Sequence, residues 1–374
     1  MRTKQLVFGE PLIEKEEIDE VVDTLKSGWI GTGPKVKKFE SDFAAYKGVE
    51  EALAVNSCTS ALHLALESLN LLPHHEVIVP AMTFSATAEA VLYTGAHLVL
   101  ADCDRNGNID PRDVWKKITP YTKAIVVVHY AGRPVDMDSI NQIAEKYSLW
   151  VIEDCAHAIE TEYKGRKAGT IGDFGCFSFY ATKNVTTGDG GMIISSKFFL
   201  NNMRTTSLHG MTKDAWGRQG KEFQHYQIIK LGFKYNMNDI EASLGIHQLA
   251  RVERNWERRQ EIWNKYNEAF EPLDNVETPA PVENGRHAYH LYTILVPDRK
   301  IFIEKLLAMN IGVGIHYRAL HLQPFYKRLG YKQWDFPNAS RISAMTVSLP
   351  LLPKMTDKDT DDVIEAVCEA SKLI

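Results

Sequence analysis

The sequence lacks most of the features of secreted, membrane-bound or nucleic-acid-binding proteins. No run of 18 apolar residues occurs, and the first residues, MRTKQLVFGEPLIEKEEID, lack the apolar core of a signal peptide. The net charge is −5 and no block of five like charges is present, which argues against binding nucleic-acid phosphates. The five cysteines, scattered without CxxC spacing, are Cys58, Cys103, Cys155, Cys176 and Cys368. We therefore expect a cytoplasmic protein with no disulfide framework, no metal, no membrane and no nucleic acid.

The chain length and patterning predict an α/β protein. Its 374 residues exceed what one small core needs, so a large domain with a smaller one is expected. Short Val/Ile-rich runs, typical of strands, alternate with helix-like stretches such as 60–69, 85–93 and 138–147. The expected strands are 51–55, 77–79, 97–101, 124–130, 149–154, 176–179 and 191–195. This order indicates a mainly parallel, seven-stranded sheet with helices on both faces, which binds ligands beyond the carboxyl ends of its strands.

The second half of the chain predicts a separate, smaller unit. Residues 238–270 show one long helical pattern, and 277–285 form a polar connection containing prolines. A second α/β set follows at 288–296, 302–310, 313–319 and 346–350, with a terminal helix from Asp357. We predict a large domain over residues 1–255 and a small C-terminal α/β domain over residues 256–374.

The densest chemical signal is FGCFSFYATKNVTTGDGGMIIS, residues 174–195. A strand ends near Ser178, Lys183 follows five residues later, and a Gly-rich turn leads into the next strand. A lysine amine in such a place can bind an aldehyde cofactor and then move protons between carbon atoms. The alternative is a surface lysine beside a hairpin turn, so Lys183 needs partners.

Asp154 is the first candidate partner. It ends the predicted strand LWVIED, and a carboxylate there can keep the ring nitrogen of pyridoxal phosphate protonated. The alternative is a helix N-cap. His157, three residues on, is in reach of the phenolic oxygen of such a cofactor, or is structural.

The phosphate of such a cofactor needs hydroxyl groups and a helix N-terminus. NSCTSALHLAL, residues 56–66, offers Thr59 and Ser60 where a strand ends and a helix begins. Ser178 adds a hydroxyl, and Phe84 follows another strand where an aromatic ring can stack on the cofactor or simply belong to the core. All these groups fall at strand ends of one sheet, a coincidence that packing alone does not explain.

Seven ordered segments resemble the motifs of the DegT/DnrJ/EryC1/StrS sugar aminotransferases. They are NSCTSALHLAL, PAMTFSAT, VHYAGRPVDMD, VIEDCAHA, FSFYATKN…TTGDGG, KYNMNDIEASLGIHQL and GIHYRALHLQPFY. The resemblance runs from GWIGTGP (28–34) to SLPLLP (348–353). It implies the pyridoxal-phosphate (PLP) aminotransferase fold of type I, with PLP as cofactor and a homodimer with shared active sites.

The resemblance also assigns roles to residues. It makes Lys183 the lysine that holds the cofactor, places Asp154 at the ring nitrogen and His157 near the phenolic oxygen, and stacks Phe84 on the ring. Thr59, Ser60 and Ser178 bind the phosphate, and Asn236 reaches the phosphate in the neighbouring subunit. Asp189 departs from many members, which have glutamate there, and its role stays open. Relatives with histidine in place of the lysine are dehydratases, which Lys183 argues against.

Within the family, GWIGTGP, VHYAGRPVD, YKGRKAGTIG and GVGIHYRALH look most like the enzymes that make UDP-4-amino-4-deoxy-L-arabinose. This implies transfer of an amino group from L-glutamate to a nucleotide-linked 4-keto sugar, with UDP favoured, for a cell-surface glycan or lipid such as lipopolysaccharide. A dTDP- or GDP-linked sugar, or a 3-keto sugar, is the alternative. The expected substrate contacts are Trp29, Thr32, His316, Tyr317 and Arg318. Basic candidates for the diphosphate are Arg218, Lys221 and Lys234, which otherwise are solvated surface charges.

Other readings are weaker. Residues 102–113, DCDRNGNIDPRD, mimic an EF-hand calcium loop, but they follow a strand, contain Pro111 and end in Asp, so we expect a polar turn. A non-catalytic regulator that kept the PLP fold is disfavoured by intact Lys183 and Asp154. An amino-acid aminotransferase usually needs an arginine clamp for the carboxylate, and only Arg318 is an attractive candidate.

Overall fold

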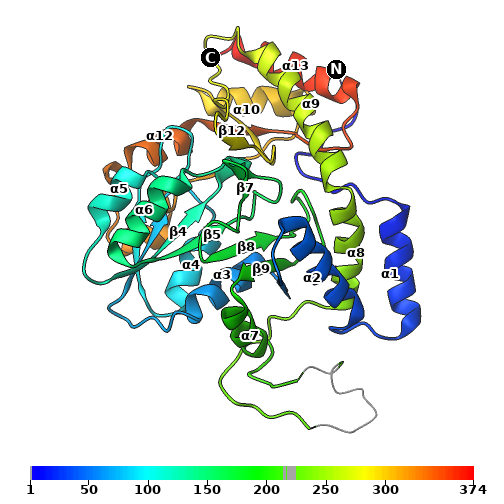
Figure 1. Ribbon diagram of the computed structural model, residues 1–374. Helices are drawn as coiled ribbons and strands as arrows, with labels where there is room; N and C mark the ends of the chain where they lie inside the picture. Colours follow the sequence, from blue (N-terminus) through cyan, green and yellow to red (C-terminus); the bar gives the residue numbers. More distant parts are fainter. Residues whose placement is uncertain (1, 214–215, 217–224) are drawn as a thin grey trace.

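A seven-stranded sheet forms the centre of the computed structural model, which describes residues 2–213, 216 and 225–374 (Figure 1). Its strand order is β1-β9-β8-β5-β4-β2-β3. The strands are β1 Leu53–Val55, β2 Glu76–Pro80, β3 His97–Ala101, β4 Thr122–Val128, β5 Trp150–Asp154, β8 Phe174–Ser178 and β9 Gly191–Ser195. Only β9 runs against its neighbours, so the expected mainly parallel seven-stranded sheet is confirmed.

Successive residues of a strand point to opposite faces of the sheet, and in these strands both sets are apolar, so helices cover both faces. On β2, Val77 and Val79 pack in one core cluster with α3 (Cys58–Glu67) and α4 (Ser85–Tyr93). Ile78 belongs to the opposite cluster, beneath α5 (Pro111–Lys117) and α6 (Met137–Tyr147). The same opposite face carries α2 (Pro34–Lys47) and α8 (Asp239–Ala250) near β1 and β9. Two-sided burial makes the strands continuous apolar runs, as the sequence predicted.

The C-terminal region has its own core around a two-stranded sheet. Antiparallel β11 (Tyr292–Leu295) and β12 (Thr346–Leu349) pack with α9 (Val252–Phe270), α10 (Arg299–Ala308) and α13 (Asp357–Ser371). Because α9 starts before residue 255 and continues into this core, the boundary predicted there falls inside a helix. The exact division into domains stays a prediction.

Two expectations about local structure are wrong. The long helix expected over 238–270 is broken at Arg251, whose φ of −112° and ψ of 13° are not helical, so α8 and α9 are separate helices. The strand expected over 313–319 is reduced to one bridge between Gly314 and Ser348. Beyond that bridge the chain leaves β12 and crosses to the large sheet, where the Leu320 amide donates to the Ala81 carbonyl (2.9 Å).

The remaining elements are short or peripheral. None of the helices among the described residues combines the length and apolar character needed to cross a bilayer. The described residues that leave α7 (Lys197–Thr206), 207–213, and those that return toward α8, 225–237, form a projecting segment at the bottom of Figure 1. The other elements are α1 Lys15–Ser27, β6 Glu162–Tyr163, β7 Arg166–Lys167, β10 Gly285–Arg286, α11 Pro324–Arg328, α12 Pro337–Met345 and the 3-10 turns Tyr130–Gly132, Leu320–Leu322 and Gln333–Asp335.

Close backbone contact between β9 and the start of α3 predicts a sensitive position at Gly191. A Cβ there would lie 2.5 Å from the Ser57 carbonyl carbon and 2.7 Å from the Cys58 amide nitrogen. We expect Gly191→Ala to lower the free energy of unfolding by about 1–3 kcal/mol, measured by urea denaturation, because backbone must shift. Gly31→Ala is the control, since nothing lies within 4 Å of its Cβ position. Equal stability of the two variants would contradict this packing.

Candidate active site

A cavity of about 470 Å³ opens beyond the carboxyl ends of the central parallel strands. Its size falls in the range of about 300–1,000 Å³ that is typical of small-molecule sites. Of the residues predicted from the sequence, it is lined by Thr59, Phe84, Asp154, His157, Ser178, Lys183, His316 and Tyr317. The fold therefore brings together residues that are up to 258 positions apart, as expected for a sheet-end site.

Lys183 lies in the turn that follows β8. Its backbone amide donates to the Tyr180 carbonyl (2.8 Å), which directs the chain back toward β9. Burial lowers the pKa of Lys183 to about 8, and the nearby Asp154 carboxylate opposes that shift. A lysine with this pKa holds a useful fraction of free amine near neutral pH, as a nucleophile requires.

Asp154 ends β5 and is only 5% exposed. Its Oδ2 accepts a hydrogen bond from Thr87 Oγ1 (2.8 Å), and its Oδ1 accepts one from the Ala156 amide (3.0 Å). Burial raises the pKa of Asp154, while these bonds and Lys183 favour the carboxylate. The alternative of a helix N-cap is wrong, because a turn rather than a helix follows β5.

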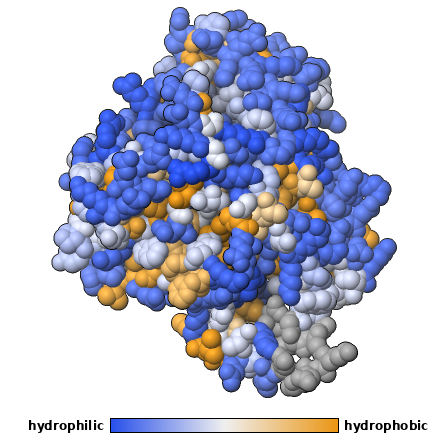
Figure 2. Space-filling view, viewed as in Figure 1, coloured by the Kyte–Doolittle hydropathy of each residue, from blue (hydrophilic) through white to orange (hydrophobic). Residues whose placement is uncertain are grey.

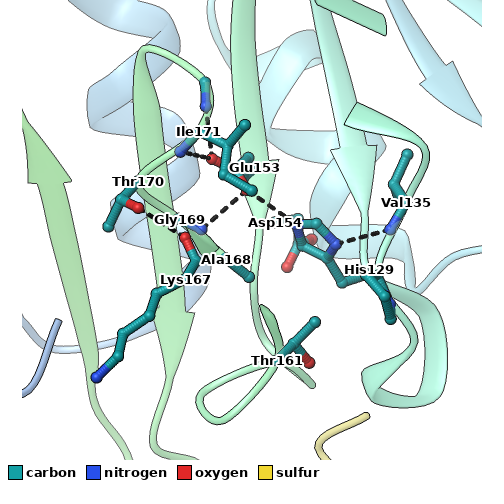
Figure 3. Close-up of polar contacts among 12 residues, drawn as sticks. His129, Val135, Glu153, Asp154, Thr161, Lys167, Ala168, Gly169, Thr170 and Ile171 are labelled. Atoms are coloured by element: carbon teal, nitrogen blue, oxygen red, sulfur yellow. Dashed lines mark hydrogen bonds and ion pairs between the residues drawn. The ribbon is translucent and has the colours of Figure 1, made fainter. Parts of the chain in front are cut away.

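The neighbouring carboxylate, Glu153, is buried without facing the cavity (Figure 3). His129 Nδ1 accepts from the Val135 amide (3.1 Å), so its Nε2 carries the proton and donates to Glu153 (2.9 Å). The amides of residues 169, 171 and 172 also donate to Glu153. Although burial alone raises the pKa of Glu153, these donors hold it below its usual value. Glu153 thus anchors the end of β5. Cys155 lies beside this pair as a third possible metal ligand, but both ring nitrogens of His129 and both oxygens of Glu153 already have hydrogen-bond partners.

His157 forms one wall of the cavity together with Tyr317. Its Nδ1 accepts from the Ala131 amide (3.2 Å), so Nε2 carries the proton toward the Tyr317 hydroxyl (3.0 Å). Burial, then Lys183, lowers the pKa of His157 well below its usual value, so the ring is neutral. The His290 ring packs against it with centroids 4.4 Å apart.

The N-terminus of α3 supplies the polar end of the cavity. Ser57 is the N-cap, and its hydroxyl accepts from the Ser60 amide (3.1 Å). Thr59 lines the cavity, whereas the Ser60 hydroxyl donates to Asn56 Oδ1 (2.7 Å). The exposed amides of a helix start favour an anion here.

Several residues that line the cavity were missed by sequence reasoning, among them Cys58, Thr83, Thr87 and Tyr180. Ser57, a serine before a helix start, also lines the cavity. Thr87 reaches Asp154 only because α4 packs beside the end of β5, and no local pattern reveals that contact.

Other predicted residues lie away from this cavity within the chain. Thr32 Oγ1 accepts from Asn236 Nδ2 (2.6 Å), and Trp29 donates to the Thr32 carbonyl (3.1 Å), so these three form a separate group. Lys234 Nζ donates to Asn236 Oδ1 (2.7 Å). Arg318 is exposed and donates to the Leu322 carbonyl (3.2 Å), outside the cavity lining. Arg218 and Lys221 lie outside the described residues.

The calcium-like segment 102–113 folds as a polar turn. Asp104 accepts from the amides of Asn106 (2.8 Å) and Asn108 (3.1 Å), and Asp110 caps α5. Asp113 accepts from the Asp102 amide (2.8 Å). Backbone amides therefore occupy carboxylates that an EF-hand would direct at its ion.

The donor set of the cavity fits pyridoxal phosphate. An amine suits the aldehyde, a buried carboxylate suits the protonated ring nitrogen, and a helix N-terminus suits the phosphate. The doubly covered parallel sheet and this site together define a PLP-dependent aminotransferase of fold type I.

Comparisons with known proteins agree. The model of the DegT/DnrJ/EryC1/StrS aminotransferase family matches residues 11–368, so the chain belongs to this family of PLP-dependent sugar aminotransferases. It is 47% identical to the spore coat polysaccharide biosynthesis protein SpsC of Bacillus subtilis (strain 168), over 99% of this chain and 98% of SpsC. The fold is similar to the putative sugar aminotransferase Spr1654 from Streptococcus pneumoniae in its PMP form (TM-score 0.93, 34% identity, 98% and 99% coverage). It is also similar to Helicobacter pylori PseC, an aminotransferase involved in the biosynthesis of pseudoaminic acid (TM-score 0.93, 27% identity, 99% and 100% coverage).

The environment of the Lys183 amine, close to the Asp154 carboxylate, leads to a prediction about the cofactor-free protein. We expect its amine to titrate near pH 8, measured by pH-dependent competitive labelling and mass spectrometry. Asp154→Asn should lower that pKa further, because the carboxylate that favours the ammonium is lost. The exposed Lys300 serves as internal control. Titration of Lys183 together with Lys300 would contradict the burial argument.

Proposed function

We propose that this protein transfers the amino group of L-glutamate to carbon 4 of a keto sugar linked to a nucleotide, with UDP favoured. The observation that carries the proposal is the cavity that the half-buried Lys183 and the buried Asp154 both line, beyond the ends of the neighbouring strands β8 and β5. SpsC is named for spore coat polysaccharide and PseC for pseudoaminic acid, which supports a product destined for a cell-surface glycan or lipid.

Different residues around the cavity would bind different parts of the cofactor. Lys183 would bind the aldehyde carbon, Asp154 would keep the ring nitrogen protonated, and Phe84 would stack on the ring. The α3 N-terminus with Thr59, and Ser178 beside it, binds the phosphate. Ser60 supports this end through its bonds to Ser57 and Asn56.

Pyridoxal phosphate, when bound, supplies an aldehyde carbon and a ring that accepts electrons. The Lys183 amine, free once the amine of glutamate has displaced it from the aldehyde, would act as acid and base: it would take the proton from the α-carbon of glutamate in the first half-reaction and deliver a proton to carbon 4 of the sugar in the second. The neutral His157, whose Nε2 hydrogen points to the Tyr317 hydroxyl, would turn that hydrogen to the phenolic oxygen. His316, which also lines the cavity, would contact the sugar.

The charge of the cavity bears on the substrate. Lys183 is the one lysine or arginine among the described residues that line it. A nucleotide diphosphate and the carboxylates of glutamate therefore need further basic groups from elsewhere. We assign these to the projecting segment between α7 and α8 of a second subunit, which contains Lys213, Lys230 and Lys234, together with Arg218 and Lys221.

A homodimer with shared sites provides that second subunit. The projecting segment exposes Ile228 (67%), Ile229 (61%) and Leu231 (89%), more apolar surface than a solvated loop needs. Apolar side chains also gather on the lower part of the face in Figure 2, whereas most of that face is hydrophilic. In the dimer, Asn236 with Thr32 and Trp29 would face the partner's cavity.

Removing the amine should abolish transfer without unfolding the protein. We expect Lys183→Ala to lose turnover by at least about 10⁴-fold while still binding PLP noncovalently. The control is Lys300→Ala, at an exposed site on α10. Measurable transamination near the parent rate in Lys183→Ala would refute the assignment.

The substrate is tested with a panel of keto sugars and glutamate. We expect UDP-linked 4-keto sugars, with and without a 6-hydroxyl or an N-acetyl group, to give the highest kcat/KM. Clear preference for dTDP- or GDP-linked sugars, or for a 3-keto isomer, would refute the substrate but leave the aminotransferase class intact. Release of 2-oxoglutarate measures the use of glutamate.

Shared sites predict complementation between two inactive variants. Asn236→Asp places a negative charge near the neighbour's phosphate and should abolish activity, as should Lys183→Ala. Co-refolded in equal amounts, the two should regain about one quarter of the parent activity, since half the dimers hold one intact site. An active monomer in analytical ultracentrifugation, or no regain, would contradict the shared site.

A further inference from the structure

Asn184, the residue after Lys183, has an unusually complete set of side-chain contacts. Its Nδ2 donates to both carboxylate oxygens of Glu160 (3.0 and 2.9 Å) and to the Ala288 carbonyl (2.9 Å). Its Oδ1 lies 2.9 Å from His290 Nδ1. Asn184, Glu160 and His290 are 5%, 2% and 8% exposed, so none of these bonds is replaced easily by water.

The chemistry of the partners fixes the orientation of this amide. The Ala288 carbonyl can only accept, so the NH2 group of Asn184 must face it, on the side where Glu160 also lies. The amide oxygen then faces His290, which must carry its proton on Nδ1. Burial lowers the pKa of His290 well below its usual value, so that ring is neutral and has a single tautomer.

The same amide joins loops that surround the cofactor cavity. Glu160 lies in the turn after β5, and Ala288 and His290 precede β11. The segment before β11 is also bonded to the predicted large domain, because the Ala288 amide donates to the Gly132 carbonyl (2.9 Å). His290 packs on His157, which contacts the Tyr317 hydroxyl, so the contacts run from Glu160 to the cavity wall.

We propose that Asn184 is a positioning residue for the reaction: its amide fixes the backbone beside Lys183 and holds His290 in the tautomer that packs against His157. Asn184 itself does not line the cavity and touches no reacting atom. The proposal rests on the proposed role of Lys183 as the lysine that holds the cofactor. A displacement of about 1 Å at such a lysine is enough to slow a reaction by about a hundredfold.

The test exchanges donor and acceptor while keeping the shape. Asn184→Asp turns the NH2 group into an oxygen that faces the Glu160 carboxylate, so we expect repulsion and a displaced Lys183. In the double variant Asn184→Asp with Glu160→Gln, the glutamine amide donates to the new carboxylate and one negative charge stays near the buried Arg259, while the bond to Ala288 stays lost. Asn264→Asp, on the exposed side of α9, makes the same chemical change as a control.

Three quantities are measured in each folded variant: the dissociation constant for PLP, kcat and the KM for the sugar. For Asn184→Asp we expect PLP affinity to fall by about tenfold and kcat by about 10- to 100-fold, with the sugar KM within about twofold. The double variant should recover most of both losses, and the control should equal the parent. Asn184→Ala gives the same comparison without an added charge if Asn184→Asp does not fold.

Parent-like PLP affinity and kcat in the Asn184 variants, or no recovery in the double variant, would overturn the proposal. A loss of thermal stability alone, with unchanged PLP affinity and kcat, would show a merely structural residue and overturn it too. Lys183→Ala separates this from the proposed function. If that variant stays active, the role of Lys183 fails; if it is inactive while Asn184→Asp behaves as the parent, only the present inference fails.

Discussion

Two consecutive carboxylates, buried at the end of one strand, constrain the whole site. Burying a carboxylate is costly unless hydrogen bonds or positive charge compensate it. Glu153 is compensated by His129 and three backbone amides, which ties the loop before β8 to the end of β5 (Figure 3). Asp154 accepts hydrogen bonds from Thr87, the Ala156 amide and the Cys58 thiol and faces the cavity, where the positive charge of Lys183 favours its carboxylate form. One carboxylate thus stabilises the scaffold and the next is left for chemistry.

The part of the cavity wall formed by His157 and Tyr317, with His290 packed behind His157, is polar but uncharged. His157 and His290 are both held neutral by burial, and backbone or amide partners fix which nitrogen of each ring carries the proton. Neutral donors can bind an oxygen without competing with Asp154 for the charge of Lys183. This separation of charged and neutral walls suits a cofactor whose ring nitrogen and phenolic oxygen lie on different edges.

The sequence predicted this site where chemistry follows strand ends, and it failed where contacts depend on packing between elements. Lys183, Asp154 and His157 stand next to strands whose apolar runs were clear, and the cavity includes all three. Thr87 and Asn184 gave no signal, because their partners come from distant segments. The strand expected over 313–319 had a suitable apolar pattern, yet bonds to the large sheet divert the chain. The break at Arg251 likewise lies in a sequence with good helical periodicity.

The site has one further requirement, which is positive charge to bind an anionic substrate. Among the described residues that line the cavity, Lys183 carries the one ammonium, and it is the group that we propose binds the cofactor. In that proposal the phosphate of the cofactor would meet uncharged hydroxyls and the α3 N-terminus, so the described lining would offer no further cation to an anionic substrate. Lys213, Lys230 and Lys234 do not line their own chain's cavity, and neither do Trp29, Thr32 and Asn236. The cavity needs positive charge to bind an anionic substrate, and the projecting segment carries lysines outside its own chain's cavity. Both features are explained if the segment of each subunit completes the site of the other.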